Sequence, residues 1–561
     1  MDSLPGQSYY ANAERKKVIQ PSLTDGFFVP LLKGYAPICL KKRWLTPIFA
    51  AMEQQQTVRV RFAPSPTGGL HLGGVRTVLF NYLFAKQHGG KFILRIEDTD
   101  QTRYVAGAEQ YIYNCLSWCG VEPDESPLVA GPFGPYRQSE RKAMYQTYAH
   151  QLIQSGKAYY AFDTPEELEQ MREDLKSKGS SSLQYDHRVR MQMKNSLTLS
   201  ADETQTLIQN GTPYVIRLCV EPGVILELND MVRGPVEMDT TFTDDKVLMK
   251  ADGMPTYHLA VVVDDYLMKI THAFRGEEWL PSAPVHLLLW QHLFGLDAMP
   301  QWAHLPLILK PDGHGKLSKR DGDRLGFPVY AMNWKDPQTG EITRGFRETG
   351  FLPEAFINML ALLGWNDGSG QEVFSLEEMT RLFSMERVHK AGAKFDYEKA
   401  KWFNHQWIQK TNVEEYSKIV AGYFKEAGIT IKDQEAFNDT LNLVKERCHL
   451  LTDFLEHAGY FYQDPVSPDV EAIRQKWGAD KVHYFNTLNT HLNQVAEWKA
   501  EQLEQDAKQL AAEQSVKFAE IQLMLRIMLV GKKAGIGVFQ IAEKIGREAT
   551  CRRVHQTMNQ L

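Results

Sequence analysis

The chain has 561 residues, too many for a single hydrophobic core, and a prior of about 150 residues per domain gives three to five domains. Its composition, 43% hydrophobic and 24% charged, is ordinary for a globular protein, and no window offers the ~18 consecutive apolar residues of a membrane helix. The net charge of −6 excludes a globally basic chain, although a local basic stripe is enough to bind phosphate.

Residues 1–51 differ in character from the rest. They show no clear helical period, and no apolar segment lies between a basic start and a cleavage site, as a secretory signal requires. Acidic residues and little arginine make a poor transit peptide. We expect a disordered extension, or an upstream segment ahead of a native start at Met52, with organelle targeting as the weaker alternative.

The first regular elements form a strand, loop, helix and strand. The alternating run 58–60 leads into 61-RFAPSPTGGLHLGG-74, and apolar residues then recur at helical spacing through 75–83 until Gly89 and Gly90. The segment 91-KFILRI-96 is typical of a buried strand. This order predicts a βαβ unit with parallel strands. The carboxyl end of the first strand and the start of the helix then form a phosphate-binding position, where His71 can donate a hydrogen bond. A capped helix with an incidental histidine explains the stretch equally well.

Cys115 and Cys119 share one face of the next predicted helix. Two thiols without further ligands make a poor zinc site, so we expect them to pack in the core. The six scattered cysteines of the chain are typical of a reducing compartment.

A glycine-rich loop, 309-LKPDGHGKLSKRDGD-323, follows the apolar run HLPLI and carries Lys316 and Lys319 at i, i+3 spacing. Such a loop can bring two point charges onto a polyphosphate. By itself it would more often be a solvated surface loop. Beyond it, 351-FLPEAFINMLALLGW-365 predicts a helix with a core-like face, and residues from about 400 onward are dominated by helical patterns.

Together, PSPTGGLHLGG and KLSKR resemble the HIGH and KMSKS signatures of class I aminoacyl-tRNA synthetases, with details similar to the bacterial-type glutamyl-tRNA synthetase branch. RIEDTD, GMPTYHLAVVVDDYLMKITHAFRGEEWL and HLPLIL are also similar to that branch and occur in its order. The resemblance covers about residues 58–407 closely and the helical remainder more weakly. It implies attachment of L-glutamate to tRNA-Glu through a glutamyl-adenylate, with ATP and Mg²⁺ as cofactor and no structural zinc.

The resemblance also implies a fold and a division into domains. The expected fold is α/β, a doubly wound parallel-sheet (Rossmann-like) catalytic domain with an inserted acceptor-binding domain and an all-α anticodon-binding half. The expected boundaries are 1–51 extension, 52–136 and 256–300 nucleotide fold, 137–255 insertion, 301–400 KLSKR loop and stem contacts, and 401–470 and 471–561 helical anticodon subdomains. Arg526, Arg547, Arg552 and Arg553 are visible as RNA-contact candidates, but none is assigned. We further expect a cytoplasmic monomer that does not contact a membrane.

For ATP, the resemblance implies contacts from His71, Gly73 and Gly74, from Glu278 and the Leu309 backbone, and from Lys316 and Lys319 at the leaving pyrophosphate. No enzyme nucleophile is needed, so positioning and charge stabilisation carry the catalysis.

For glutamate, the resemblance implies a pocket of Arg61, Ala63, Ser65, Glu97, Tyr257, Val261 and Arg275, with the arginines on carboxylates and Glu97 at the ammonium. Alternatives stay open at both arginines. Arg61 alternates with Arg59 as an exposed strand arginine would, and Arg275 could pair with Glu277 or Glu278. Val261 departs from the family's usual asparagine, which puts one polar contact in doubt.

The segment 157–163, where some family members carry zinc cysteines, has none here, and neither has YDHR at 185–188. We therefore expect hydrophobic packing and hydrogen bonds in place of a structural zinc.

Four alternatives compete with a glutamate–tRNA ligase. A glutamine-specific or dual-specific ligase is disfavoured by PSPTG, Arg61 and Arg275, whereas a form that also charges tRNA-Gln depends on anticodon contacts that the sequence does not locate. Intact His71, Lys316 and Lys319 speak against a catalytically dead scaffold. A small-molecule nucleotidyltransferase of the same superfamily needs no helical C-terminal half.

Overall fold

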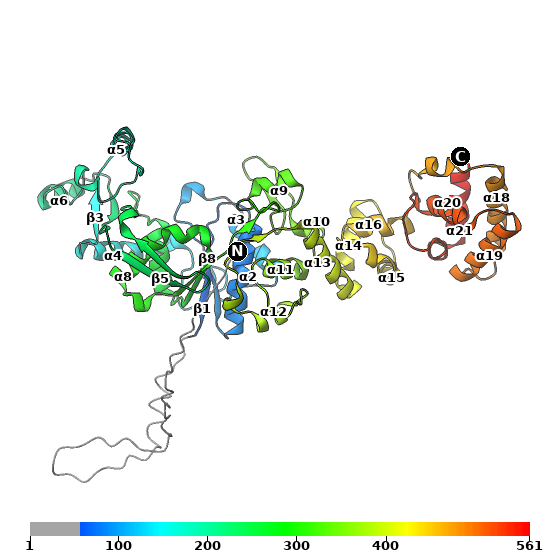
Figure 1. Ribbon diagram of the computed structural model, residues 1–561, viewed down its shortest axis with the longest axis horizontal. Coiled ribbons are helices and arrows are strands. Elements are labelled where there is room, and N and C mark those ends of the chain that lie inside the picture. The colour runs from blue at the N-terminus through cyan, green and yellow to red at the C-terminus, as the bar shows by residue number, and fades with distance from the viewer. Residues whose placement is uncertain (1–56) are drawn as a thin grey trace, which may run out of the picture. The chain divides into compact units, whose positions relative to one another are not determined.

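The computed structural model describes residues 57–561, and for Lys319, Arg320 and Asp323 it describes the backbone but not the side chain. The expectation for residues 1–51 lies outside the described residues. Figure 1 shows the sheet-containing part of the chain and the helices that follow it. Within residues 57–561, no helix combines the length and the apolar character needed to cross a membrane.

A six-stranded sheet forms the centre of the first part and confirms the α/β expectation. Its first five strands run parallel and its last is antiparallel, because β5 and β6 form a hairpin. In spatial order the strands are β2 (Lys91–Leu94), β1 (Arg59–Phe62), β8 (His272–Gly276), β9 (Gln301–Leu305), β5 (Ile225–Asp230) and β6 (Gly234–Asp239).

Helices connect these strands as the sequence predicts for the first unit. The helix α2 begins directly after His71 and ends beside Gly89, whose φ of 61° suits a helix stop. The surrounding helices are α2 (Leu72–Gln87), α3 (Ala108–Trp118), α4 (Lys142–Gln154), α7 (Tyr257–Leu267) and α8 (Ala283–Leu293). Cys115 and Cys119 are both buried, and Cys115 packs in the core on α3.

A smaller antiparallel sheet lies in the segment between α4 and α7. It consists of β3 (Ala158–Ala161), β4 (Val215–Leu218) and β7 (Val247–Met249), accompanied by α5 (Pro165–Ser177) and α6 (Ala201–Gln209). The charged helix α5 starts with a capping box of Thr164 and Glu167 and buries only Met171. The strands β5 and β6 lie in the expected insertion, 137–255, yet β5 pairs with β9 of the central sheet.

Residues 301–400 carry short strands and four helices, the last two of which pack against α2. They are β10 (Ile308–Leu309), α9 (Lys319–Leu325), β11 (Trp334–Lys335), β12 (Ile342–Thr343), α10 (Phe346–Thr349), α11 (Pro353–Leu362), α12 (Leu376–Leu382) and β13 (Ala393–Lys394). Trp365, the last residue of the stretch for which a core-like helix face was expected, is fully buried after α11.

The remaining residues are helical, as expected. The helices are α13 (Tyr397–Lys410), α14 (Val413–Glu426), α15 (Gln434–Val444), α16 (Asp453–Ala458), α17 (Val470–Arg474), α18 (Ala479–Gln494), α19 (Ala500–Glu513), α20 (Phe518–Val530) and α21 (Val538–Met558). Short 3₁₀ turns complete the described chain: η2 (Gln101–Arg103), η3 (Gln138–Arg141), η4 (Arg190–Gln192), η5 (Thr240–Phe242), η6 (Glu277–Ser282), η7 (Leu296–Ala298), η8 (Met385–Arg387), η9 (Lys445–Arg447) and η10 (Gly459–Phe461).

Several arginines of this half have structural partners. Arg552 and Arg553 both donate to Asp464, and Arg547 donates to the carbonyl oxygen of Val495 just after α18. These contacts give the three side chains a role within the fold.

Candidate active site

The loop between β1 and α2 places His71 at the helix N-terminus. His71 Nδ1 accepts a hydrogen bond from the backbone N–H of Gly73 at 3.2 Å, so a neutral ring carries its proton on Nε2. The loop is tightly packed, because a Cβ at Gly69 would lie 2.7 Å from the Tyr330 ring. This geometry holds the histidine at the carboxyl edge of the sheet, where helix N–H groups favour anions.

The lysine loop lies at the same edge. It folds as a hairpin in which Leu309 bridges Lys316 and Leu317 donates to the carbonyl of Ile308. Lys316 Nζ reaches Glu278 Oε1 at 2.5 Å, and Glu278 stands directly after β8. Both side chains are partly exposed, so the pair is held weakly and can open for a ligand. The two motif segments therefore meet at the strand ends.

Lys319 begins α9, and its side chain lies outside the described residues. The start of this helix is well ordered by hydrogen bonds. Asp321 accepts from both the backbone N–H and the hydroxyl of Ser318, and Lys310 lies 3.2 Å from Asp321. These contacts hold the pKa of Asp321 well below its usual range. The backbone of Lys319 is thus anchored next to Lys316.

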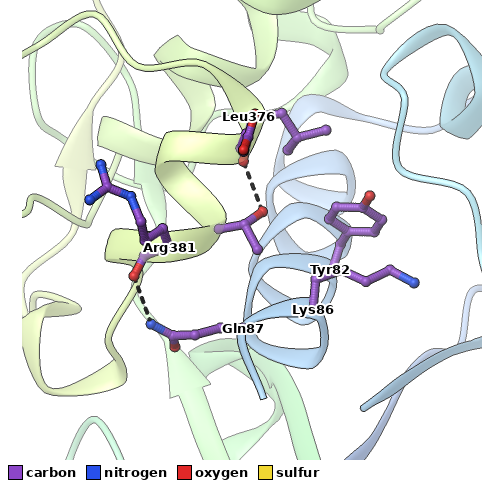
Figure 2. A pocket seen from close by; sticks show the side chains of 7 residues that line it. Tyr82, Lys86, Gln87, Leu376 and Arg381 are labelled. Carbon is purple, nitrogen blue, oxygen red and sulfur yellow. Dashed lines mark hydrogen bonds between the residues drawn. The ribbon is translucent and has the colours of Figure 1, made fainter. Parts of the chain in front are cut away.

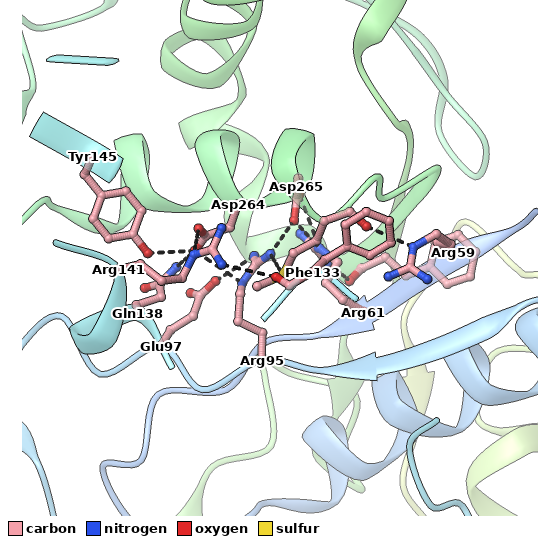
Figure 3. A network of polar contacts seen from close by, with 12 residues as sticks. Arg59, Arg61, Arg95, Glu97, Phe133, Gln138, Arg141, Tyr145, Asp264 and Asp265 are labelled. Carbon is pink, nitrogen blue, oxygen red and sulfur yellow. Dashed lines mark hydrogen bonds and ion pairs between the residues drawn. The ribbon is translucent and has the colours of Figure 1, made fainter. Parts of the chain in front are cut away.

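A buried network of charges lies beneath the loop, and Figure 3 shows it from close by. Arg61 Nε donates to Asp265 Oδ1 at 3.0 Å, and Arg95 Nη1 donates to the same oxygen at 2.8 Å. Burial works against the ionised carboxyl, but the two guanidinium groups outweigh it and keep the pKa of Asp265 below its usual value. Arg61 is therefore not an exposed strand arginine, and it is already paired with a carboxylate.

Glu97 joins this network through Arg95, whose Nη2 donates to Glu97 Oε1 at 3.0 Å. Burial raises the pKa of Glu97, while Arg95 and Arg61 pull it down. The backbone N–H of Glu97 donates to the carbonyl of Pro64, which fixes the acid beside the loop that holds Ala63 and Ser65. Ser65 is exposed on that loop.

Arg275 has no carboxylate partner among the described residues. Glu277 pairs with Arg233 and Glu278 with Lys316, so both acids proposed as alternatives for Arg275 are used elsewhere. Arg275 instead donates from Nε to His304 Nε2 at 3.1 Å and from Nη1 to His286 Nδ1 at 3.0 Å. Its Nη2 is buried and lacks a hydrogen-bond partner in residues 57–561. Burial, and after it the nearby charge of Arg61, lowers the pKa of Arg275 to about 10.

Two residues of α7 complete the expected pocket. Tyr257 forms a wall, with its ring centroid 5.2 Å from that of Trp279 and its hydroxyl 2.5 Å from the hydroxyl of Ser282. Val261, which replaces the family's asparagine, is 7% exposed and packs in the apolar cluster beneath α7 and α8. The position contributes packing rather than a polar contact.

The segment 157–163 and residues 185–195 are joined by a small apolar cluster and hydrogen bonds. Tyr185 and Met171 pack with Tyr159, and the Tyr185 hydroxyl donates to Asp163 at 3.1 Å. Asn195 donates to the same hydroxyl at 3.2 Å.

Five buried residues of the site were not predicted from the sequence: Arg95, Asp265, His286, His304 and Asp230. Each stands within or just after an apolar strand or helix, for example His304 in WAHLPLI and Asp265 in VVVDDYL. A charged or imidazole group in such a run must find a buried partner, because an unpaired one is costly. The sequence therefore indicates that each of these residues has a buried partner, but it does not identify that partner.

Two cavities in the catalytic part differ in their relation to the motifs. A groove of about 770 Å³ lies between α2 and α12, lined by Tyr82, Lys86, Gln87 and Arg381 (Figure 2), at the opposite end of α2 from His71. A cavity of about 490 Å³ reaches Tyr257 and His258 from the smaller sheet, where Arg217 and Lys246 line it. Of the two, only the second is lined by a residue of the expected site, Tyr257 at the start of α7.

Known proteins match this chain along almost its whole described length. Residues 57–402 match the family model of the class I tRNA synthetase (E and Q) catalytic domain, and residues 397–558 match an anticodon binding domain. A glutamate–tRNA ligase of Porphyromonas gingivalis is 50% identical over 89% of this chain and 98% of its own length. One of Amoebophilus asiaticus is 49% identical over 90% of this chain and 98% of its own.

Solved structures agree with these matches. The crystal structure of a glutamate tRNA ligase from Elizabethkingia meningosepticum, in complex with its amino acid, has a TM-score of 0.85 and 45% sequence identity. The matched region covers 90% of this chain and 100% of the chain in that crystal structure.

Proposed function

Because this chain belongs to the class I tRNA synthetases that act on glutamate and glutamine, we propose roles in that reaction for the residues gathered at the strand ends. The reaction is the ATP-dependent attachment of L-glutamate to the 3′ end of tRNA-Glu. It passes through a glutamyl-adenylate and releases AMP and pyrophosphate. The observation that carries the proposal is the Lys316–Glu278 contact, which brings the lysine loop to the strand ends beside the His71 loop.

In the first step, the glutamate carboxylate attacks the α-phosphate of ATP and pyrophosphate leaves. His71, at the N-terminus of α2, contacts the phosphates together with the backbones of Gly73 and Gly74. Lys316 leaves Glu278 and, with Lys319, neutralises the pyrophosphate as charge develops on it. Glu278 and the Leu309 backbone bind the adenosine.

The amino acid occupies the pocket between β1, β8 and α7. Arg275 binds one glutamate carboxylate, with Arg61 supporting it, and Glu97 meets the ammonium group. The Ala63 backbone and Ser65 line the loop side, Tyr257 forms the wall, and Val261 packs beneath it. Since the Nη2 group of Arg275 is buried and has no hydrogen-bond partner among the described residues, a bound carboxylate satisfies a donor that is otherwise costly.

In the second step, the 2′-hydroxyl of the terminal tRNA adenosine attacks the acyl carbon, and AMP leaves. The cavity at Tyr257 and His258 is where the acceptor end enters, because it adjoins the pocket and carries the cationic side chains of Arg217 and Lys246. Residues 137–255 supply the far wall of this entrance, and the helical residues 401–561 contact the anticodon.

The proposal includes Mg²⁺ bound with ATP, and a cytoplasmic monomer without a structural zinc. In residues 57–561 no group of three or more histidine, cysteine, aspartate or glutamate side chains is placed to hold a metal. This fits a magnesium ion bound mainly by phosphate oxygens and water, where it neutralises part of the phosphate charge. Sedimentation of the chain with and without tRNA tests the monomer.

The deciding experiment is aminoacylation of purified tRNA-Glu and tRNA-Gln, each with radiolabelled glutamate and with glutamine as the control amino acid. Charging of tRNA-Glu alone by glutamate supports a discriminating ligase. Charging of both tRNAs by glutamate identifies a non-discriminating form. Charging of neither by a folded chain contradicts the proposed roles.

A variant separates the enzyme from a catalytically dead scaffold that binds tRNA. Lys319→Ala is expected to lower kcat of adenylate formation by roughly two orders of magnitude or more, because it removes a charge that acts on the transition state. Circular dichroism checks that the variant folds. Unchanged ATP–pyrophosphate exchange in Lys319→Ala would rule out its assigned role.

A further inference from the structure

A row of buried polar side chains runs across the sheet behind Arg275. Asp230 at the end of β5 accepts from His304 Nδ1 at 2.6 Å, and His304 Nε2 accepts from Arg275. On the other side of Arg275, His286 of α8 lies 3.0 Å from Nη1, and its Nε2 lies 3.1 Å from His258 Nδ1. Five residues from five elements therefore form one chain of hydrogen bonds.

The arginine determines where every proton in this row lies. A guanidinium group can only donate, so His304 Nε2 and His286 Nδ1 must both accept. His304 then carries its proton on Nδ1 and donates it to Asp230, and His286 carries its proton on Nε2 and donates it to His258. Burial lowers the pKa of all three imidazoles, to about 3 for His258, which agrees with neutral rings.

The two arginines of the pocket differ in charge compensation. Arg61 shares the carboxylate of Asp265 with Arg95. Arg275 is held by two neutral rings, and Asp230 is reached only through His304. The Arg275 guanidinium also lies over the Trp302 ring at 4.8 Å from its centroid. The site thus orients Arg275 rigidly without neutralising it.

We infer that His304 and His286 are positioning residues that hold Arg275 through neutral acceptors, so that its charge stays available to a carboxylate of the substrate, while Asp230 accepts from His304 Nδ1 and orients the ring. The inference rests on the proposed role of Arg275. A carboxylate at either imidazole position would hold the guanidinium equally firmly but would compete with the substrate for its charge. A neutral acceptor avoids that competition, and the preorganised group needs no rearrangement on binding.

Matched variants test the acceptor requirement. Arg275 donates to Nε2 of His304 and to Nδ1 of His286. The glutamine Oε1 of His304→Gln and the asparagine Oδ1 of His286→Asn lie at the corresponding side-chain positions and can replace these two acceptors. His304→Leu and His286→Leu remove them. ATP–pyrophosphate exchange at varied glutamate and varied ATP gives both KM values, and thermal melts followed by circular dichroism check folding.

Each leucine variant is expected to raise KM for glutamate about 10- to 100-fold, the range for loss of a buried hydrogen bond to a charged group, with KM for ATP within about 2-fold. The amide variants are expected to restore KM for glutamate to within about 5-fold of the parent. Equal KM values in the leucine and amide variants would overturn the inference.

His286→Asp tests whether the acceptor at this position must be neutral, separately from whether Arg275 must be held by a hydrogen bond there. Its carboxylate accepts from Arg275 but cancels the charge, so KM for glutamate should rise as much as in His286→Leu while KM for ATP stays unchanged. A purely structural role predicts instead that His286→Asp behaves like His286→Asn, and that result contradicts the inference. Should His286→Asp fail to fold, the two His304 variants still decide the acceptor requirement.

Arg275→Ala distinguishes the inference from the function on which it rests. If Arg275→Ala leaves KM for glutamate unchanged, the proposed role of Arg275 fails and the inference fails with it. If Arg275→Ala weakens glutamate but His304→Leu and His286→Leu do not, the role of Arg275 stands and only the inference is wrong.

Discussion

At the scale of single residues, Arg275 differs from the neighbouring arginines in having no carboxylate partner among the described residues. Its partners are imidazole nitrogens, whereas Arg61 is paired with Asp265 and Arg59 with Glu125. After burial, the nearby charge of Arg61 lowers the pKa of Arg275. If Arg275 has the proposed role, an anionic ligand relieves this repulsion, which predicts a preference for an acidic amino acid over a neutral one.

Arg275→Ala should therefore raise KM for glutamate at least about 50-fold, because a charge-assisted contact to the carboxylate is lost. KM for ATP should change by less than about 3-fold. ATP–pyrophosphate exchange measures both. A parallel loss for the two ligands, together with a lower melting temperature, would point to unfolding rather than to a lost contact.

The buried histidines predict how stability depends on pH. Burial first, and then the charges of Lys246 and Arg275, lowers the pKa of His258 from 6.5 to about 3. Between these two pKa values the unfolded chain binds a proton at His258 and the folded chain does not. The free energy of unfolding is therefore unaffected by this group above pH 6.5 and decreases as the pH falls from 6.5 toward 3. For one such histidine, the free energy of unfolding falls by about 1 kcal/mol when the pH is lowered from about 7 to about 5.5.

His258→Asn should consequently lose less stability than the parent chain over the same pH interval. Asparagine keeps an acceptor for His286 but does not titrate. Thermal melts at the two pH values give the comparison, with the exposed His314→Asn as control. Identical pH slopes for the parent and His258→Asn would contradict the assignment of this titration to His258.

At the scale of elements, the smaller sheet is held by the hydroxyl group of Tyr185. This group links Asp163 after β3 to Asn195, and Arg217 of β4 lies over the Tyr185 ring at 4.0 Å from its centroid. These contacts join the stretches 159–163 and 185–195. The packing around α5 depends on these contacts, because the helix itself buries only Met171.

Tyr185→Phe is expected to destabilise this segment by about 1–2 kcal/mol, because it removes two hydrogen bonds in a partly buried site. Limited proteolysis between β3 and β4 measures the effect. Tyr160→Phe is the matched control, since its hydroxyl makes no hydrogen bond within residues 57–561. EDTA should leave the cleavage rate of the parent unchanged, and faster cleavage in EDTA would indicate a metal at this position.

At the scale of the whole molecule, two helices connect the catalytic part to the helical half. α11 and α13 each contribute to both apolar cores, with Phe356 and Phe403 in the first and Ala355 and Trp407 in the second. Asn404, which lies on α13 between Phe403 and Trp407, is fully buried. It accepts from the backbone of Leu352 and donates to the carbonyls of Gly350 and His449. This one side chain satisfies backbone groups on both sides of the junction.

Asn404→Ala should loosen the junction, because three buried backbone groups lose their partner at roughly 1 kcal/mol or more each. We expect a larger KM for tRNA-Glu in aminoacylation and little change in ATP–pyrophosphate exchange, which needs only the catalytic part. Asn412→Ala, an exposed helix cap without a side-chain hydrogen bond, is the control. Equal loss in both assays would show that the whole fold, rather than the junction, depends on Asn404.

What the sequence determined by itself is local in origin. The order β1, loop, α2, β2 follows from residue periodicity and glycine positions, and the burial of Trp365 and Cys115 follows from apolar helix faces. The motifs also indicated the candidate site from local sequence. Their residues lie on short segments whose strand and helix ends can be placed from the residue pattern alone.

The tertiary structure alone decided the charge state of that site. The alternation of Arg59 and Arg61 suggested an exposed face, but both faces of a parallel sheet are covered, so both arginines are buried and paired. The partners of Arg61 and Arg275 lie on α7, β9 and α8, far along the chain. Pairing in a buried site depends on which strand ends and helices meet, and the packing of the sheet, not any short stretch of sequence, sets that meeting.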